Sequence, residues 1–272
     1  GGCSLQHLDP DAQVQAKQSV LLDNLRQIGR VTPESLLPPM LNSSPWGYRR
    51  KARLGVKDVA RKGKVLVGFR ERGSSFVADV EICHVLHPRV GELLPQLSAL
   101  IESLSVSRRL PQIEMAMDDE RCVLILRILD PLSDADEALL HGFEQEHGIV
   151  FYVQPGGPET VAPLRVPVDL RYALPAYDLT LGFLPGDFTQ VNTEINIKMI
   201  DCAIGLLEPT ERDDVLDLFC GVGTWGLILA SELGPTRVSG VVGIEEHRGA
   251  VDCAGRNAHV AALGHRARFR AG

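Results

Sequence analysis

The sequence predicts an α+β domain over residues 1–175, followed by an incomplete α/β, Rossmann-like domain over residues 176–272. Two patterns predict this order. Short alternating strands with intervening turns recur between residues 48 and 153, mixed with helical stretches. From residue 192 the pattern changes to helix, strand, helix, strand, helix, which is βαβ spacing and indicates a parallel sheet. The loop Pro-Gly-Gly-Pro at residues 155–158 lies between the two patterns.

The first domain begins with a helix expected over residues 9–28. Asp9 can cap it, Pro10 fits its first turn and Gly29 can end it. A β-ribbon is expected over residues 48–80, because apolar and polar residues alternate between glycine turns. A helix over 90–104, paired strands over 113–117 and 122–128, a helix over 134–147 and a strand over 149–153 complete this domain.

The second domain opens with two short strands, near Leu170 and over residues 179–183. A helix over 192–207, a buried strand over 215–219, a helix over 225–233, a strand over 241–245 and a helix over 249–263 follow. Only about two strands of the parallel sheet precede Gly272, and two parallel strands are hard to bury on both faces. We therefore expect the chain to be a fragment of a longer protein.

Charge is distributed unevenly along the chain. The net charge is −7, yet residues 49–72 hold ten Lys or Arg and two acids, a local balance of +8 that leaves −15 for the rest. No apolar run approaches the ~20 residues of a membrane span, and the N-terminus lacks the pattern of a signal peptide. Six scattered cysteines favour a reducing, cytoplasmic setting over a disulfide framework.

The most informative motif is Val-Leu-Asp-Leu-Phe-Cys-Gly-Val-Gly-Thr at residues 215–224. A strand carrying Asp217 ends in a loop where Gly221 and Gly223 allow positive φ and close approach of a ligand to the backbone. Glu245 ends the next strand, 24 residues after Gly221, and its carboxylate is suited to hold two ribose hydroxyls. The pattern predicts a nucleoside-binding site.

Two kinds of cofactor use this geometry. Gly226 completes the dinucleotide pattern Gly-x-Gly-x-x-Gly, in which a pyrophosphate lies at the helix start. An acid shortly before Gly-x-Gly, here Asp217, is instead typical of class I S-adenosylmethionine-dependent methyltransferases, whose sulfonium cofactor carries no phosphate. We favour the methyltransferase and keep dinucleotide binding as the alternative. A plain strand-to-helix turn without a ligand would not explain why the next strand ends in the carboxylate of Glu245.

Three segments extend this interpretation by resemblance. Asp-Phe-Thr-Gln-Val-Asn at 187–192, residues 215–223 and Val-Gly-Ile-Glu at 242–245 resemble successive signatures of the RumA/RlmD group of 23S rRNA (uracil-C5)-methyltransferases, relatives of the tRNA enzyme TrmA. Thr224 stands where several members have Asn, and Ala261 replaces the second Asn of the family's Asn-Ala-x-x-Asn segment. The resemblance implies S-adenosylmethionine contacts from Gln190, Phe219, Thr224 and Glu245, beside the loop residues Asp217, Gly221 and Gly223.

Two cysteines are covered by the same resemblance. Residues 1–7 are similar to the end of the family's cysteine-rich segment, and residues 81–86 to the surroundings of its distant cysteine. The resemblance implies a [4Fe–4S] cluster with Cys3 and Cys83 as two of four thiolate ligands. Because two ligands are not enough, we expect the cluster in the longer protein and an absent or incomplete one here. The alternatives are ordinary thiols or a zinc site that adds His84 and His87.

The chemistry implied is methylation of C5 of a uridine in 23S rRNA. Family enzymes add a cysteine thiolate to C6, and a general base later removes the C5 proton. No residue here matches the motifs that carry the two groups, so we expect both beyond Gly272 and expect this fragment not to methylate. Cys220 is expected to be a small packed residue of the cofactor loop. A tRNA uracil-C5 methyltransferase, an RNA-binding module with a vestigial cofactor pocket and a dinucleotide oxidoreductase are the alternatives.

The basic part of the expected β-ribbon, residues 48–72, is called the basic ribbon and is the predicted RNA-facing surface. The expected partner is 23S rRNA. Tyr48 or Trp46 could stack a base. The alternative is a solvated strand edge whose charges prevent aggregation. We expect no membrane association and infer no protein partner. The candidate RNA-binding residues are Tyr48, Arg49, Arg50, Lys51, Arg53, Lys62 and Lys64.

Overall fold

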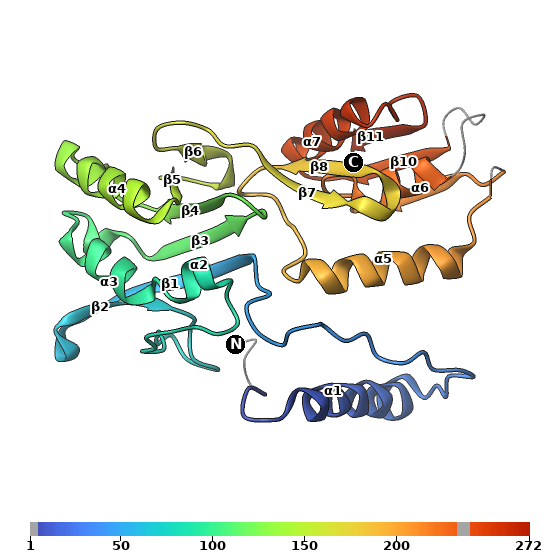
Figure 1. The fold of residues 1–272 in the computed structure, drawn as a ribbon, viewed down its shortest axis with the longest axis horizontal. Helices are drawn as coiled ribbons and strands as arrows, with labels where there is room; N and C mark the ends of the chain where they lie inside the picture. Colours follow the sequence, from blue (N-terminus) through green and yellow to red (C-terminus); the bar gives the residue numbers. More distant parts are fainter. Residues whose placement is uncertain (1–4, 211, 233–239) are drawn as a thin grey trace.

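The computed structural model describes residues 5–210, 212–232 and 240–272. Two halves lie side by side along the long axis, and each is built around its own sheet (Figure 1). In the described part of the chain, no helix combines the length and the apolarity needed to cross a lipid bilayer.

The first half holds a six-stranded sheet in the order β2-β1-β3-β4-β5-β6. All neighbouring strands pair antiparallel except β4 and β5, which are parallel because the connection through helix α4 crosses over the sheet. The strands are β1 (Lys51–Val59), β2 (Lys64–Gly68), β3 (Gln112–Met117), β4 (Cys122–Arg127), β5 (Val150–Gln154) and β6 (Ala162–Pro163).

Helices α2 (Pro88–Gly91), α3 (Leu94–Ser103) and α4 (Asp134–His147) belong to this half (Figure 1). The prediction for α4 is confirmed, because Ser133 forms a capping box in which its hydroxyl accepts from the Asp136 amide and the Asp136 carboxylate accepts from the Ser133 amide. The single helix expected over 90–104 is divided into two. Pro95 has no amide to donate to an earlier carbonyl, so it is accommodated in the first turn of a new helix.

Strand β4 is buried on both faces. Leu124 and Leu126 pack with α3 and α4 in one core. Val123 and Ile125 point the other way and pack with residues of the second half, including Phe183 and Val222. The sheet therefore forms a wall against which the second half rests.

The second half combines a hairpin with a parallel sheet. The hairpin strands β7 (Leu170–Leu174) and β8 (Leu179–Phe183) pair antiparallel, and the parallel sheet has the order β11-β10-β9. The parallel strands are β9 (Val215–Leu218), β10 (Val241–Glu245) and β11 (Ala267–Ala271), and the helices are α5 (Thr193–Leu207), α6 (Thr224–Glu232) and α7 (Arg248–Val260). Leu233, the expected last residue of α6, lies outside the described residues.

Two expectations for the parallel sheet are corrected. The sheet has three strands rather than two, because β11 pairs parallel with β10; its alternating arginines did not mark it as a buried strand. The strand expected to be buried over 215–219 is an edge. Leu216 and Leu218 remain 59% and 57% exposed, since β9 pairs on one side only.

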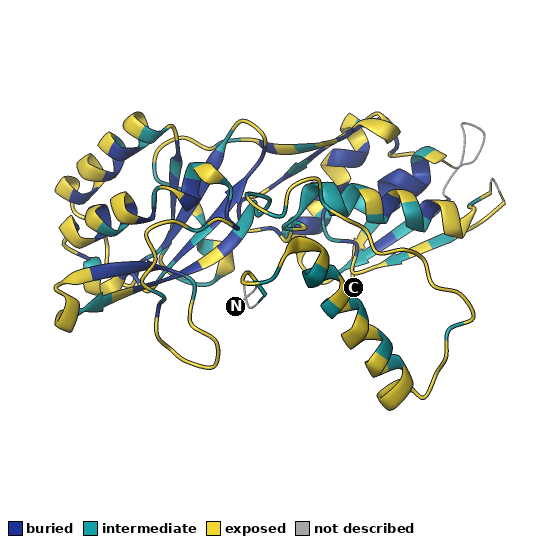
Figure 2. Cartoon of the chain, turned by 60° about the horizontal axis from the view of Figure 1, so that its bottom comes forward, coloured by how far each residue is buried: buried dark blue, intermediate teal, exposed yellow. Residues whose placement is uncertain are grey.

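Helix α1 (Pro10–Asn24) lies apart from both sheets (Figures 1 and 2). Its predicted cap is confirmed: the Asp9 side chain accepts from the Asp11 amide at 2.9 Å. A π-helical turn, Leu25–Gly29, extends the helix to the predicted end. None of its residues is buried, so the apolar side chains of Val20 and Leu21 face solvent.

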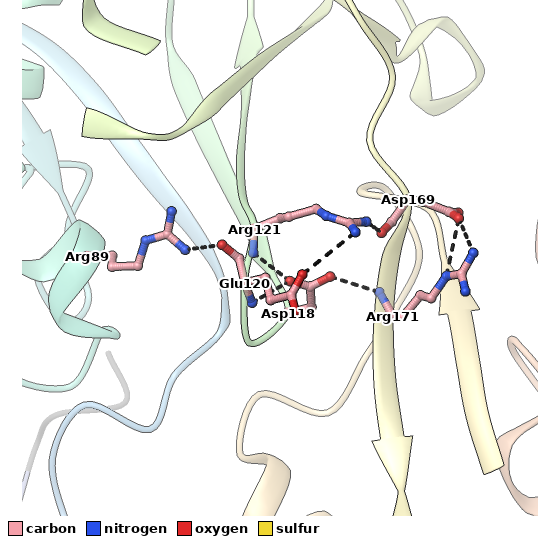
Figure 3. A network of polar contacts seen from close by, with 6 residues as sticks. All are labelled: Arg89, Asp118, Glu120, Arg121, Asp169 and Arg171. Carbon is pink, nitrogen blue, oxygen red and sulfur yellow. Dashed lines mark hydrogen bonds and ion pairs between the residues drawn. The ribbon is translucent and has the colours of Figure 1, made fainter. Parts of the chain in front are cut away.

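A polar network at the β3–β4 turn connects the two halves (Figure 3). The buried carboxylate of Asp118 accepts from the amides of Glu120 (2.9 Å) and Arg121 (2.6 Å) in its own turn, and from the amide of Arg171 (3.1 Å) in β7. The Arg121 guanidinium donates to the carbonyl of Asp169. These bonds fix the turn against the hairpin of the second half.

Candidate functional site

The loop between β9 and α6 has the backbone that its glycines predicted. Phe219, Gly221 and Gly223 have φ of 58°, 55° and 87°. A Cβ at Gly221 would have no atom within 4 Å, whereas at Gly223 it would lie 3.0 Å from the side chains of Ala254 and Phe269. Gly223 is therefore required by packing as well as by conformation, and Gly221 faces open space.

Glu245 lies at the end of β10 and points at this loop. Its Oε2 accepts a hydrogen bond from the Gly221 amide at 3.0 Å, and its Oε1 accepts from the His247 amide at 3.0 Å. A carboxylate at the carboxyl end of one parallel strand thus supports the glycine loop of the neighbouring strand, which is the arrangement expected of a nucleoside-binding site.

Asp217 is directed into the fold. Its Oδ2 accepts from the Gly226 amide at 3.0 Å, in the first turn of α6, where a negative charge is favoured. Burial raises the pKa of this carboxyl, and the bond from Gly226 opposes the shift. A Cβ at Gly226 would lie 3.3 Å from Asp217 Oδ2 and from Val241, so close helix–sheet packing accounts for the third glycine.

A cavity of about 200 Å³, the first cavity, opens beside the loop. Four of the predicted cofactor residues line it, namely Gln190, Phe219, Gly221 and Thr224. The other three do not line it: Gly223 is packed within the loop, Glu245 accepts from the loop amide of Gly221, and Asp217 accepts from the Gly226 amide of α6. Phe219 is 85% exposed, which leaves its ring available to a ligand.

The remaining lining residues come from three further parts of the chain, of which only the signature at residues 187–192 was linked to the loop by a motif. The segment around the start of α5 contributes Phe188, Thr189, Thr193 and Asn196. The hairpin contributes Tyr172, Ala173 and Phe183, and the first half contributes Arg50, Met117, Asp118 and Asp119. Sequence spacing gave no signal for the hairpin and first-half residues, because only the packing of the two halves brings them to the loop. Cys220, Val222 and Trp225 complete the lining.

Tyr172 is the clearest of the residues that the sequence did not indicate. Its hydroxyl is hydrogen-bonded to Thr224 Oγ1 at the start of α6. Burial raises the pKa of Tyr172 to about 12, against the effect of the bond to Thr224, so the phenol stays protonated near neutral pH. The pair fixes the Thr224 side chain on the cavity wall.

Cys220 has the environment of a packed thiol. It is buried, and burial, with smaller contributions from Asp217 and Glu245, raises its pKa to about 12. A thiol that stays protonated near neutral pH is a poor nucleophile. The geometry agrees with the interpretation of Cys220 as a core residue.

Four of the ten Lys and Arg side chains of residues 49–72 form ion pairs with acids from elsewhere in the described part of the chain. Arg50 bonds Asp119 at 2.6 Å beside the first cavity, and Arg53 bonds Glu114 at 2.8 Å. These pairs reduce the positive field that the sequence count suggested.

The other candidate RNA-binding residues also contact groups within the chain. Lys62 and Lys64 bond Asp79 at 2.5 and 2.8 Å. Arg49 lies over the ring of Phe69, 5.5 Å from its centroid, and donates from Nε to the Lys51 carbonyl at 3.1 Å. The ammonium of Lys51 itself donates to the Pro185 carbonyl, and Tyr48 lies on a different cavity, described below. RNA binding by this surface therefore stays a prediction.

The predicted metal ligands are only partly described. Cys3 lies outside the described residues, and Cys83 is a half-buried free thiol. Within the described ranges, no three side chains of His, Cys, Asp or Glu come together as a metal site. The described residues by themselves therefore do not supply the four thiolates that a [4Fe–4S] cluster needs.

Comparison with known proteins relates this geometry to a family. A family model described as tRNA (uracil-5-)-methyltransferase matches residues 173–264. The chain is 53% identical over 262 residues to the protein named 23S rRNA (uracil(1939)-C(5))-methyltransferase RlmD of Alkalilimnicola ehrlichii, with 95% of this chain and 57% of the relative covered. Its identity to the RlmD of Nitrosospira multiformis is 46% over 272 residues, covering 99% of this chain and 60% of that protein. The chain thus spans less than two thirds of the length of these relatives.

A solved structure shares the fold. The tRNA (uracil-54, C5)-methyltransferase of Pyrococcus abyssi, determined with S-adenosyl-L-homocysteine, superposes with a TM-score of 0.69 and 22% sequence identity, covering 100% of this chain and 65% of that one. Its likeness supports the Rossmann-like methyltransferase fold of the second half. The sequence identities to the RlmD proteins and the family-model match show that the chain belongs to the RNA uracil-C5 methyltransferase family of RlmD and TrmA type.

Proposed function

We propose that this chain binds S-adenosylmethionine and forms the cofactor-binding part of an enzyme that methylates C5 of a uridine in 23S rRNA. The observation that carries the proposal is the bond from the Gly221 amide to the Glu245 carboxylate, beside a cavity lined by Gln190, Phe219 and Thr224. The names of the relatives that align with nearly the whole chain support the rRNA substrate over tRNA.

The residues of the first cavity fit such a cofactor. Gly221 leaves open space above its Cα, the exposed ring of Phe219 offers an apolar face, and Thr224 and Gln190 offer polar groups. Glu245 is placed to exchange its bond with the loop amide for bonds with ribose hydroxyls. When bound, the cofactor supplies an electrophilic methyl group.

The nucleophile and the base of the reaction are proposed to lie beyond residue 272. Cys220 is the one cysteine that lines the first cavity among the described residues, and its raised pKa argues against a thiolate there. The chain should therefore bind cofactor without methylating RNA. The exposed edge of β9, with Leu216 and Leu218 uncovered, supports a further strand of the parallel sheet in the longer protein.

Three further proposals concern the organisation of the protein. We propose two domains, but the β7–β8 hairpin spans the boundary predicted between residues 175 and 176, which favours a division before Leu170. A [4Fe–4S] cluster is proposed only for the longer protein, with Cys3 and Cys83 among its ligands. The five described cysteines are all free thiols, which supports a cytoplasmic location.

Calorimetry with S-adenosylhomocysteine and with NAD⁺ tests the cofactor. We expect the former to bind and the latter not to. Glu245→Gln should weaken S-adenosylhomocysteine binding by roughly 1–3 kcal/mol, because a charge-assisted hydrogen bond is lost. Glu246→Gln, an exposed neighbour, is the matched control and should bind as the unchanged protein does. Binding of NAD⁺ alone, or equal affinity of both variants, would contradict the proposal.

A further inference from the structure

A second cavity, of about 430 Å³, lies between α1, the segment 40–48 and the start of α5. We infer that it binds an unpaired nucleotide of the RNA substrate next to the one presented to the first cavity. The inference rests on the proposed function, because it assumes that RNA reaches the first cavity. Residues that carry the argument are Lys17, Asn42, Trp46, Tyr48, Asn192 and Ile195.

The two cavities share a wall. In the first turn of α5, Thr193 and Asn196 line the first cavity, whereas the cap Asn192 and Ile195 line the second. The cavities are thus separated by about one helix, whose diameter with side chains is roughly 10 Å. A single RNA strand passing over this turn can offer one base to each side.

The segment that enters β1 repeats this division. Tyr48 lines the second cavity and Arg50, two residues later, lines the first, while Arg49 between them lies over Phe69. In extended backbone, residues two apart lie on the same side, so Tyr48 and Arg50 face one side of this segment and Arg49 the other. The two cavities therefore lie along the same side of this segment and are parts of one surface.

The outer wall of the second cavity is held in place by α5. The Glu194 carboxylate accepts from the Ser43 amide at 2.9 and 3.0 Å and from its hydroxyl at 2.6 Å, and Lys198 donates to the Leu41 carbonyl at 2.6 Å. Hydrogen bonds from Lys198 and Ser43 lower the pKa of Glu194 to about 2, so the carboxylate is ionised near neutral pH. The segment around Asn42 is therefore positioned before any ligand binds.

The lining offers the groups that single-stranded RNA needs. The indole of Trp46 is 41% exposed and can stack on a base, as aromatic side chains do in RNA-binding proteins. Asn42 Oδ1 is buried and accepts no hydrogen bond from the described residues, while its Nδ2 donates to the Ser44 carbonyl at 2.6 Å. An N–H on the edge of a base would satisfy this acceptor.

The charged groups of the lining are Lys17 and Asp11 of α1. Lys17 is exposed and forms no ion pair with another described residue, so its ammonium is available to a phosphate. Asp11 can accept from a base but would repel a phosphate. A ligand with its sugar–phosphate toward Lys17 and its base toward Trp46 and Asn42 matches this distribution.

The two tryptophans of the chain provide the test, because Trp46 lines the second cavity and Trp225 the first. In a Trp225→Phe variant, emission comes from Trp46 alone. A short single-stranded oligouridylate should quench it. Trp46→Ala should weaken oligouridylate binding about five-fold or more, the lower end of the stacking contribution, and Trp46→Phe should largely restore it.

Two milder variants guard against a folding defect. Asn42→Ala and Lys17→Ala should each weaken oligouridylate binding several-fold, whereas Arg165→Ala, an exposed basic residue outside both cavities and outside the basic ribbon, should change it less. Equal affinity of all variants, or oligouridylate binding without a change in Trp46 emission, would overturn the inference. So would quenching that depends on protein concentration in the absence of RNA, which would identify a second copy as the occupant.

The test separates this inference from the cofactor proposal. If the protein binds S-adenosylhomocysteine but no oligouridylate, the result supports the cofactor proposal and contradicts RNA binding in the second cavity. A protein that binds oligouridylate through Trp46 but no S-adenosylhomocysteine would contradict the cofactor proposal instead.

Discussion

Asn257 connects the hairpin to the cofactor loop, and its removal should be costly. The side chain lies in α7 and is 5% exposed. Its Oδ1 accepts from the Gly182 amide at 2.8 Å, and its Nδ2 donates to the carbonyls of Gly182 and Val222, each at 3.0 Å. One amide group thus provides the hydrogen bonds that a neighbouring strand would provide.

The magnitude follows from the groups left behind by Asn257→Ala. A buried polar group without a partner costs about 1–3 kcal/mol. The Gly182 amide and the Val222 carbonyl each lose the partner that Asn257 provides, whereas the Gly182 carbonyl still accepts from the Cys253 thiol. We therefore expect the free energy of unfolding to fall by about 2–4 kcal/mol. Affinity for S-adenosylhomocysteine should fall as well, because Val222 belongs to the cofactor loop.

Urea denaturation followed by circular dichroism measures the first effect, and calorimetry measures the second. His259→Ala is the control, since His259 is exposed on the same helix and should change stability by less than about 0.5 kcal/mol. A loss below about 0.5 kcal/mol for Asn257→Ala, with an unchanged denaturant slope, would refute the argument that these three bonds hold the loop.

Three other predictions follow from single sites. Burial opposes ionisation of Asp136, but hydrogen bonds from Ser105 and Ser133 hold its pKa at about 2, below the ordinary aspartate value of 3.8. The carboxylate therefore stabilises the fold above about pH 4, and this contribution is lost as the pH falls toward about 2. Asp136→Asn should therefore cost about 2 kcal/mol at neutral pH, and its difference from the unchanged protein in acid titration should shrink across that window. Cys220 should resist iodoacetamide in the folded protein at pH 8 and react once unfolded, as mass spectrometry can show; rapid labelling of the native thiol would contradict its burial. Arg53→Gln should reduce the salt dependence of RNA binding less than Lys57→Gln, because Arg53 is paired with Glu114; equal slopes would count against screening by the pair.

The sequence by itself determined the elements that depend on local bonding and periodicity. Asp9 caps α1 as predicted, and alternating residues marked β1. The glycine loop lies between β9 and α6 as predicted, with Glu245 at the end of the neighbouring strand β10. Each depends on hydrogen bonds or side-chain spacing within a few residues, or on the regular geometry of adjacent parallel strands. Such features can be predicted from one sequence.

The tertiary structure alone decided which groups meet. Tyr172 reaches Thr224, and Arg50 reaches Asp119 at the first cavity, across separations that carry no periodic signal. The same packing pairs the basic ribbon with distant acids and turns Asp217 toward the Gly226 amide. The physical reason is that contacts between elements are set by how two sheets pack against each other, and local propensity does not encode that packing.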